Sequence, residues 1–192
     1  KLTGLTSSTK YFYKVISDEI ESNIYTFHTS YGKDDEITFT VYGDSRGVWD
    51  NWQNASIVAK SIESHNPNFV LHSGDLVKNG NYIDQWLDFF SISNYIHNST
   101  LIPILGNHEY YGLLFFNYFI LPNNEKWYSF DYGPCHFIVL DQYEPFGVGT
   151  SQFEWLENDL ATTSSLFRIV CFHEPIYCKG GHSPRTDIKE IW

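Results

Sequence analysis

Four side chains able to bind a metal ion each follow a separate apolar run of this 192-residue chain. They are Asp44, Asp75, Asn107 and His173. Carboxylate and amide oxygens combined with an imidazole nitrogen suit divalent or trivalent ions such as those of Mn, Fe and Zn. A lone Gly-Asp pair is more often a simple turn. The prediction of a metal site therefore depends on all four residues occurring together and in this order.

The elements that must position these side chains are alternating strands and helices. The apolar runs read as buried strands, at 37–42, 69–71, 101–105 and 167–172. Amphipathic stretches read as helices, at 51–64 (capped by Asp50 or Asn51), 82–96 and 151–161. This alternation predicts a layered α/β/α sandwich, and a hairpin formed by 127–132 and 136–140 places it in a mixed sheet. Ligands collect outside the carboxyl ends of strands in open sheets, so we expect the four side chains to converge on one rim.

The composition narrows the classes of partner. The formal net charge is −11, and an acidic surface repels a phosphate backbone, so no long nucleic acid is expected to bind. A small phosphate ester is still allowed, because bound cations dominate the local field. No apolar run reaches the ~18 residues of a transmembrane segment. The odd number of cysteines (Cys135, Cys171 and Cys178) favours free thiols, and a Cys171–Cys178 bridge remains the alternative.

The order of the motifs resembles the calcineurin-like metallophosphoesterase family, and most closely its purple acid phosphatase branch, over about residues 37–187. The motifs that carry the resemblance are Gly43-Asp44, Gly74-Asp75, Gly106-Asn107-His108-Glu109, and His173 before Glu174-Pro175. The resemblance implies an incomplete four-layer α/β/β/α sandwich with mixed sheets. It also implies two metal ions of Fe, Mn or Zn type.

The resemblance assigns a role to each site residue. It places Asp44 on the first metal, Asp75 as the bridging ligand, and Asn107 and His173 on the second metal. His108 is expected to face the substrate and Glu109 to orient its neighbours. His182 matches a substrate histidine of plant-type enzymes, with a surface-loop histidine as the alternative. Arg46 cannot bind a cation but can hold a phosphate oxygen, with a surface salt bridge as the alternative. The other histidines are expected to be structural, at 28, 65, 72, 97 and 136.

The sequence departs from the family pattern at two points. Lys78 stands where the purple enzymes have a tyrosine, and a protonated lysine cannot bind iron, so no purple chromophore is expected. The last family motif, GHxH, is absent, and His182 is the last histidine. The sequence thus resembles a fragment that ends before the active site is complete. Alone, it is expected to bind its second metal poorly and to be inactive or weakly active.

The chain is expected to contain parts of two domains. Residues 1–30 are predicted to be the last strands of a fibronectin type III-like domain, because Leu5, Thr9 and Tyr11 are spaced as in a tyrosine corner. Residues 31–36 form a charged linker, and 37–192 form the metallophosphoesterase domain. The fibronectin-like start and the family resemblance imply an extracytoplasmic location. The oligomeric state is not indicated.

The function implied is hydrolysis of small phosphate monoesters, of acid phosphatase type. Two ions about 3.5–4 Å apart can clamp a phosphoryl group and supply a bridging hydroxide, with His108 assisting the leaving alcohol. One alternative is a phosphodiesterase or nucleotide hydrolase of the same fold. Another is a non-catalytic scaffold or binding module, which Lys78 and the absent GHxH favour.

Overall fold

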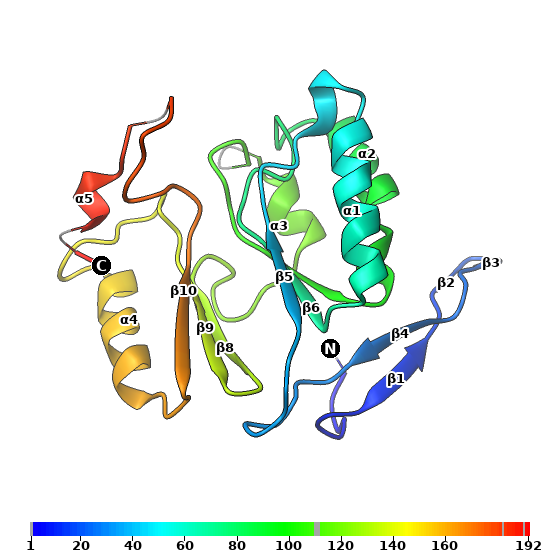
Figure 1. Ribbon diagram of the computed structural model, residues 1–192, viewed down its shortest axis with the longest axis horizontal. Coiled ribbons are helices and arrows are strands. Elements are labelled where there is room, and N and C mark those ends of the chain that lie inside the picture. The colour runs from blue at the N-terminus through cyan, green and yellow to red at the C-terminus, as the bar shows by residue number, and fades with distance from the viewer. Residues whose placement is uncertain (1, 110–111, 182, 190) are drawn as a thin grey trace.

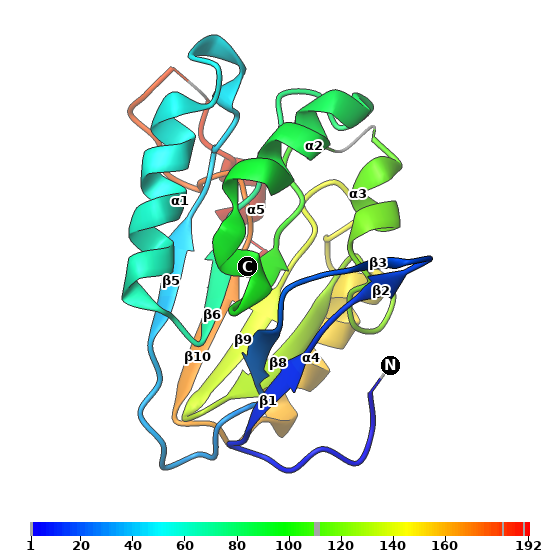
Figure 2. The same cartoon turned by 90° about the vertical axis from the view of Figure 1, so that its right-hand side faces the viewer.

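Two three-stranded sheets lie face to face, and helices cover the outer face of each (Figure 1). The structure is a computed structural model that describes residues 2–109, 112–181, 183–189 and 191–192. The layers run α/β/β/α, as the family resemblance implied. The alternation of strands and helices alone predicted one sheet in an α/β/α sandwich, and it was wrong because the strands divide between two sheets. This arrangement sets the carboxyl ends of β5, β6 and β10 at the same end of the molecule (Figure 2).

The first sheet is parallel throughout. Its strands lie in the order β5 (Phe39–Tyr42), β6 (Phe69–His72) and β7 (Thr100–Pro103). Every residue of the central strand β6 is buried, because layers cover both of its faces. Three helices lie on its outer side, α1 (Gln53–His65), α2 (Ile83–Ile92) and α3 (Leu114–Tyr118). Ala59 and Ile62 of α1 pack against Val70 of β6, which fixes the helix on the sheet.

The second sheet is mixed. It contains β8 (Tyr128–Tyr132), β9 (Cys135–Val139) and β10 (Phe167–Cys171) in the order β10-β9-β8. Strands β8 and β9 are antiparallel and β9 and β10 parallel, so the predicted hairpin is confirmed. Helix α4 (Ser151–Thr162) covers the outer face through Leu156, which packs on Ile138 and Leu140. The short helix α5 (Thr186–Lys189) follows later in the chain.

Aromatic side chains form the core between the two sheets. Phe69 of the first sheet lies 5.2 Å, ring centre to ring centre, from Phe137 of the second, at 87°. Phe39 contacts Phe137 edge-on at 5.3 Å. Edge-to-face pairs of this kind add about 0.5–1.5 kcal/mol to the stabilisation from burial alone. The high aromatic content of the chain therefore serves, in this region, to hold the two sheets together.

The amino-terminal residues form a ribbon that rests on the α/β domain. Its strands are β1 (Lys10–Tyr13) and β4 (Tyr25–His28), which are antiparallel, with β2 (Ile16–Ser17) and β3 (Ile20–Glu21) at the tip. The Tyr11 hydroxyl accepts a hydrogen bond from the Thr6 N–H at 2.9 Å, the contact expected of a tyrosine corner. The Tyr25 ring stacks on His97 at 4.3 Å. The fibronectin type III assignment and the domain boundaries stay predictions.

Several local features differ from the expectation. Helix α1 begins at Gln53 after Trp52, which has a φ of 62° and no capping side chain, although the Asp50 carboxylate does accept the Asn54 N–H. The helix expected at 82–96 ends as α2 at Ile92, and the 3₁₀ helices η2 (Asn94–His97) and η1 (Gly47–Trp49) complete the layer. All three cysteines are free. Within the described ranges, no helix combines the length and apolarity needed to cross a membrane.

Candidate metal and phosphate-binding site

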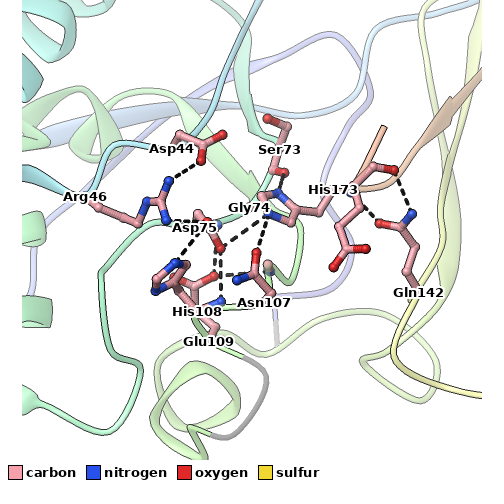
Figure 3. Close-up of polar contacts among 12 residues, drawn as sticks. Asp44, Arg46, Ser73, Gly74, Asp75, Asn107, His108, Glu109, Gln142 and His173 are labelled. Carbon is pink, nitrogen blue, oxygen red and sulfur yellow. Dashed lines mark hydrogen bonds and ion pairs between the residues drawn. The ribbon is translucent and has the colours of Figure 1, made fainter. Parts of the chain in front are cut away.

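The strand ends bring the four predicted metal ligands to one cavity. It has a volume of about 390 Å³ and is lined by Asp44, Arg46, Asp75, Asn107, His173, Glu174, Pro175 and Ser183. The His173 Nε2 atom lies 3.1 Å from Asn107 Oδ1 and 3.4 Å from Asp75 Oδ1 (Figure 3). Asp44 joins this group through Arg46, whose guanidinium contacts both Asp44 and Asp75. The convergence expected from the sequence is therefore present.

Unusual backbone conformations place the two aspartates at the cavity. Asp44 and Asp75 have φ values of 53° and 59°, in the left-handed region that Asp tolerates better than most residues. The glycine before each permits a close approach between loops. A Cβ on Gly43 would lie 2.0 Å from the Ser73 Oγ atom, and one on Gly74 would lie 2.5 Å from His173 Nδ1. Left-handed non-glycine residues cost about 1–3 kcal/mol and cluster at functional sites, as these two do.

Glu109 fixes the two loops that carry Asp75 and Asn107. Its buried carboxylate accepts backbone N–H groups from Asp75 and Val77, both at 2.9 Å, and from Gly106 at 3.1 Å. Burial raises the pKa of Glu109 to about 7, and the bonds from these N–H groups act in the opposite direction. The expected orienting role of Glu109 thus has a physical basis in three backbone hydrogen bonds.

The His173 ring is oriented as a metal-binding imidazole usually is. Its Nδ1 atom lies 2.7 Å from the Ser73 carbonyl oxygen, so Nδ1–H donates there and Nε2 is turned toward the cavity. Nε2 faces two oxygen atoms, those of Asn107 and Asp75. A lone pair and two oxygens brought together require either a proton or a metal cation between them.

The charges of the site follow from these contacts. Burial lowers the pKa of His173, but the hydrogen bond and charge of Asp75 outweigh it, so the pKa is raised. Burial alone would raise the pKa of Asp75, yet His173, the His108 N–H and Arg46 together lower it. Asp75 is thus held as a carboxylate, the form that binds metal ions.

Arg46 lies between the two aspartates. Its Nη2 atom is 2.6 Å from Asp44 Oδ1, and its Nη1 atom is 3.0 Å from Asp75 Oδ2. Its Cζ atom lies 5.7 Å from the centre of the Trp49 ring, and Lys78 Nζ lies 5.1 Å from the same ring. The two alternatives for Arg46 were a salt bridge and a contact to a phosphate oxygen. The structure contains ion pairs of Arg46, and its side chain also lines the cavity, where a phosphate group can reach it.

The residues suit one metal position better than the other. Asp75, Asn107 and His173 present two oxygens and a nitrogen to one point, which fits a divalent or trivalent ion. At Asp44, the carboxylate is instead paired with a guanidinium, and Lys78 cannot act as a ligand while protonated. Within the described ranges, no three His, Cys, Asp or Glu side chains are grouped to hold a metal, so the set includes the Asn107 amide.

The two predicted substrate histidines differ in what the structure describes. The His108 N–H donates to Asp75 Oδ1 at 3.1 Å, and its Nδ1 atom is hydrogen-bonded to the Lys78 carbonyl oxygen. Its Nε2 atom lies 3.8 Å from Asp75 Oδ2, on the side of the carboxylate that Arg46 also contacts. His182 lies outside the described residues.

One structural residue of the site was missed by the sequence reasoning. The Gln142 side-chain amide donates to the Glu174 carbonyl at 2.8 Å and accepts the Glu174 N–H, which ties the loop after β9 to the segment after His173. Arg185 holds the Glu174 carboxylate from the other side at 2.6 Å. The available signal was position, because Gln142 lies two residues after the apolar run that ends at Leu140.

His72 shows the structural alternative for a histidine at a strand end. It is fully buried in β6, its ring is edge-on to Tyr42, and its Nε2 atom is 2.8 Å from Ser45 Oγ. Burial lowers its pKa to about 3, so the imidazole is neutral. Its expected structural role agrees with these contacts.

The fold and the order of ligands define a metallophosphoesterase domain. The sequence profile of the calcineurin-like phosphoesterase family matches residues 37–190, and the chain belongs to this family. In fold it is similar to purple acid phosphatase PPD1 from yellow lupin, with a TM-score of 0.79 over 98% of this chain and 40% of that chain, at 24% identity. It also resembles PhoD, with a TM-score of 0.63 over 87% and 48%, at 14% identity.

Similar sequences point to the same branch. The chain is 26% identical to Fe(3+)-Zn(2+) purple acid phosphatase 12 of Arabidopsis thaliana, over 94% of this chain and 44% of the relative. It is 28% identical to phosphoenolpyruvate phosphatase of Allium cepa, over 92% and 41%. It is also 28% identical to probable inactive purple acid phosphatase 24 of Arabidopsis thaliana, over 84% and 32%. The chain thus spans less than half the length of these relatives.

Proposed function

We propose that this protein is a metal-dependent phosphatase of acid phosphatase type that acts on small phosphate monoesters. Family membership and the similarity to phosphatases support this class of reaction. The observation that carries the proposal is the His173 ring, whose Nδ1–H is held by the Ser73 carbonyl while Nε2 faces Asn107 and Asp75. This is the arrangement of a metal ligand rather than of a buried structural histidine.

In this proposal, Asp75, Asn107 and His173 hold a metal of Fe, Mn or Zn type. When bound, such an ion supplies a water whose pKa is lowered from about 15.7 toward 7 and polarises the phosphoryl group. The protein's own part is to fix the loops that carry the ligands through the hydrogen bonds of Glu109. Two observations bear on the number of ions. The name of one relative, an Fe(3+)-Zn(2+) purple acid phosphatase, supports two ions, whereas the ion pair between Arg46 and Asp44 disfavours an ion at Asp44.

The substrate contacts are assigned to three residues. Arg46 has N–H donors beyond those used by the aspartates, and these bind phosphate oxygens. His108, in its imidazolium form, donates its Nε2 proton to the leaving alkoxide, while its Nδ1 bond to the Lys78 carbonyl holds the ring in place. His182 is retained as a further substrate contact by its match to the family position. An extracytoplasmic location is also part of the proposal.

A non-catalytic domain is the second candidate function. It is favoured by the ion pairs of Arg46 with both aspartates and by Lys78 at a position where a ligand is expected. The name of one relative, probable inactive purple acid phosphatase 24, also supports this candidate. Hydrolysis of phosphodiesters by the same site remains the alternative within the enzyme class.

The test is turnover of p-nitrophenyl phosphate by the full-length protein, measured together with its metal content. We expect Asp75→Ala to lose both turnover and metal, and the exposed Asp88→Ala on α2 to retain both. Retention of metal and turnover in Asp75→Ala would contradict the proposed site. A metal-loaded wild type without turnover on monoesters or diesters would favour the non-catalytic candidate.

A further inference from the structure

We infer that the Arg46 guanidinium replaces one of the two metal ions of the family's site, so that the complete site holds a single ion on Asp75, Asn107 and His173. The inference rests on the proposed metal site but not on the proposed turnover. It concerns the side of the cavity formed by Asp44, where the resemblance places a first ion and the structure places a protein cation.

The geometry of Arg46 is that of a bridge between two strands. One terminal nitrogen lies 2.6 Å from Asp44 Oδ1, after β5, and the other lies 3.0 Å from Asp75 Oδ2, after β6. Charge-assisted hydrogen bonds of this length are the strong ones, and each joins a different carboxylate. The guanidinium therefore links the same two carboxylates that the resemblance assigns to the first ion.

Arg46 is confined to this position by its surroundings. Only 20% of its side chain is exposed, and its Nε atom is buried without a partner among the described residues. The Trp49 ring lies beside the guanidinium, at a distance typical of cation–π contacts. Binding an ion to both carboxylates would break two ion pairs and leave a largely buried arginine beside a second cation.

The balance of charge distinguishes the two sides of the cavity. Asp44 and Asp75 carry two negative charges, and Arg46, which is paired with both, offsets one of them. A divalent ion on this side would have to displace a fixed cation from both carboxylates. On the other side, Asn107 and His173 add ligand atoms beside Asp75 and bring no arginine or lysine side chain.

The chemical consequence is a site with one exchangeable cation and one permanent one. The guanidinium cannot be deprotonated in a protein and cannot acidify a water molecule. It can still neutralise charge on a bound phosphate oxygen, which is a role that a second ion would otherwise serve. The fixed charge of Arg46 would therefore remain when the metal is removed.

The experiment counts metal ions per chain in the full-length protein. Protein is saturated with Zn²⁺, freed of loosely bound metal and analysed by mass spectrometry of the elements. We expect wild type to bind one ion, Arg46→Lys to bind one, and Arg46→His to bind two, because imidazole is a ligand and brings no fixed charge. Substitution with Co²⁺ supplies a second readout, since a pair of neighbouring ions shows magnetic coupling and a single ion does not.

Two ions in wild type, or the same number in wild type and Arg46→His, would overturn the inference. Circular dichroism of each variant shows whether a low number of ions per chain reflects loss of the fold. If Arg46→His unfolds, the number of ions in wild type and in Arg46→Lys still tests the inference, which predicts one ion in each. A single ion together with no turnover would leave the inference standing and refute the proposed function. Two ions with turnover would do the reverse.

Discussion

Two histidines, His136 and His173, are paired with carboxylates at opposite ends of the second sheet, and they differ in one respect. Both ring nitrogens of His136 meet carboxylates, Asp131 at 2.8 Å and Asp159 at 2.7 Å. Nδ1 of His173 meets the Ser73 carbonyl oxygen, and Nε2 faces oxygen atoms of Asn107 and Asp75 that line a cavity. We call the first cluster closed because both ring nitrogens already meet carboxylates, one of which comes from α4, although this cluster also borders a cavity of about 240 Å³. We call the second cluster open because, among the residues that the structure describes, its Nε2 atom meets no second carboxylate at hydrogen-bonding distance and faces the larger cavity.

The comparison shows that residue type alone does not mark a metal site. Both clusters contain an imidazole and carboxylates, but the Asp131–His136–Asp159 cluster satisfies itself and further hydroxyls contact its oxygens. At His173, left-handed aspartates and a backbone acceptor on Nδ1 prevent such closure. What distinguishes a structural histidine from a candidate metal ligand is therefore which group contacts each ring nitrogen, and not the number of ionisable groups nearby.

Replacing each histidine by alanine should separate the two regions most strongly. We expect His173→Ala in the full-length protein to lose turnover by more than about 100-fold, because loss of a ligand exceeds the 10–100-fold effect typical of its supporting residues. His136→Ala should retain the turnover of wild type per folded molecule. Steady-state kinetics with p-nitrophenyl phosphate measures both. Equal losses in the two variants would contradict the distinction.

Glu109→Gln tests how far the open cluster depends on its support. An amide has one acceptor oxygen in place of two, so at least one of the Asp75, Val77 and Gly106 N–H groups loses its partner. We expect metal affinity to fall by about 10–100-fold, the effect of removing an outer hydrogen bond. Competition with a metal-binding dye measures the affinity. An unchanged affinity would show that the loops are held by other contacts.

The closed cluster should contribute to stability instead. His136→Ala removes both hydrogen bonds and leaves the partly buried Asp159 carboxylate short of a partner, which should lower the free energy of unfolding by about 1–3 kcal/mol. Urea denaturation followed by tryptophan fluorescence measures the change. A variant as stable as wild type would show that this cluster is not a structural link.

The contribution of His136 should also depend on pH. Burial lowers the pKa of His136, but the bonds to Asp159 and Asp131 outweigh it, so the folded pKa is raised above the unfolded value of about 6.5. Stability from this charge is therefore fully present below that unfolded pKa and is lost as the pH rises through the folded pKa. The stability difference between wild type and His136→Gln should be larger at pH 6 than at pH 9. A difference that grows with pH would contradict the sign.

Much of the site could be predicted because its ligands follow strands. The apolar runs before Asp44, Asp75 and His173 are short, and the ends of parallel strands meet at one edge. The expectation that all of these strands are buried was wrong for β5 and β10, because they lie at the edges of their sheets, and of the three only β6 is fully buried. The hairpin β8–β9 was equally visible, since two apolar runs flank a turn at Gly133 and Pro134. In these elements local pattern and tertiary structure agree.

The remainder depends on contacts that have no local pattern. The two ion pairs of Arg46 arise because the loops after β5 and β6 lie side by side, which residue spacing does not show. The bonds between Gln142 and Glu174 join positions far apart in the chain. The break between α2 and η2 at Ser93 interrupts a continuous helical pattern, and tertiary packing of Tyr95 accompanies it.

The most direct test is the anomalous X-ray scattering of a Zn²⁺-saturated crystal of the full-length protein. The account predicts a peak about 2.0–2.1 Å from His173 Nε2, the usual zinc–imidazole distance, with Asp75 and Asn107 as neighbouring ligands. A saturated crystal with no anomalous peak beside His173 would contradict the assignment of this cavity as a metal site.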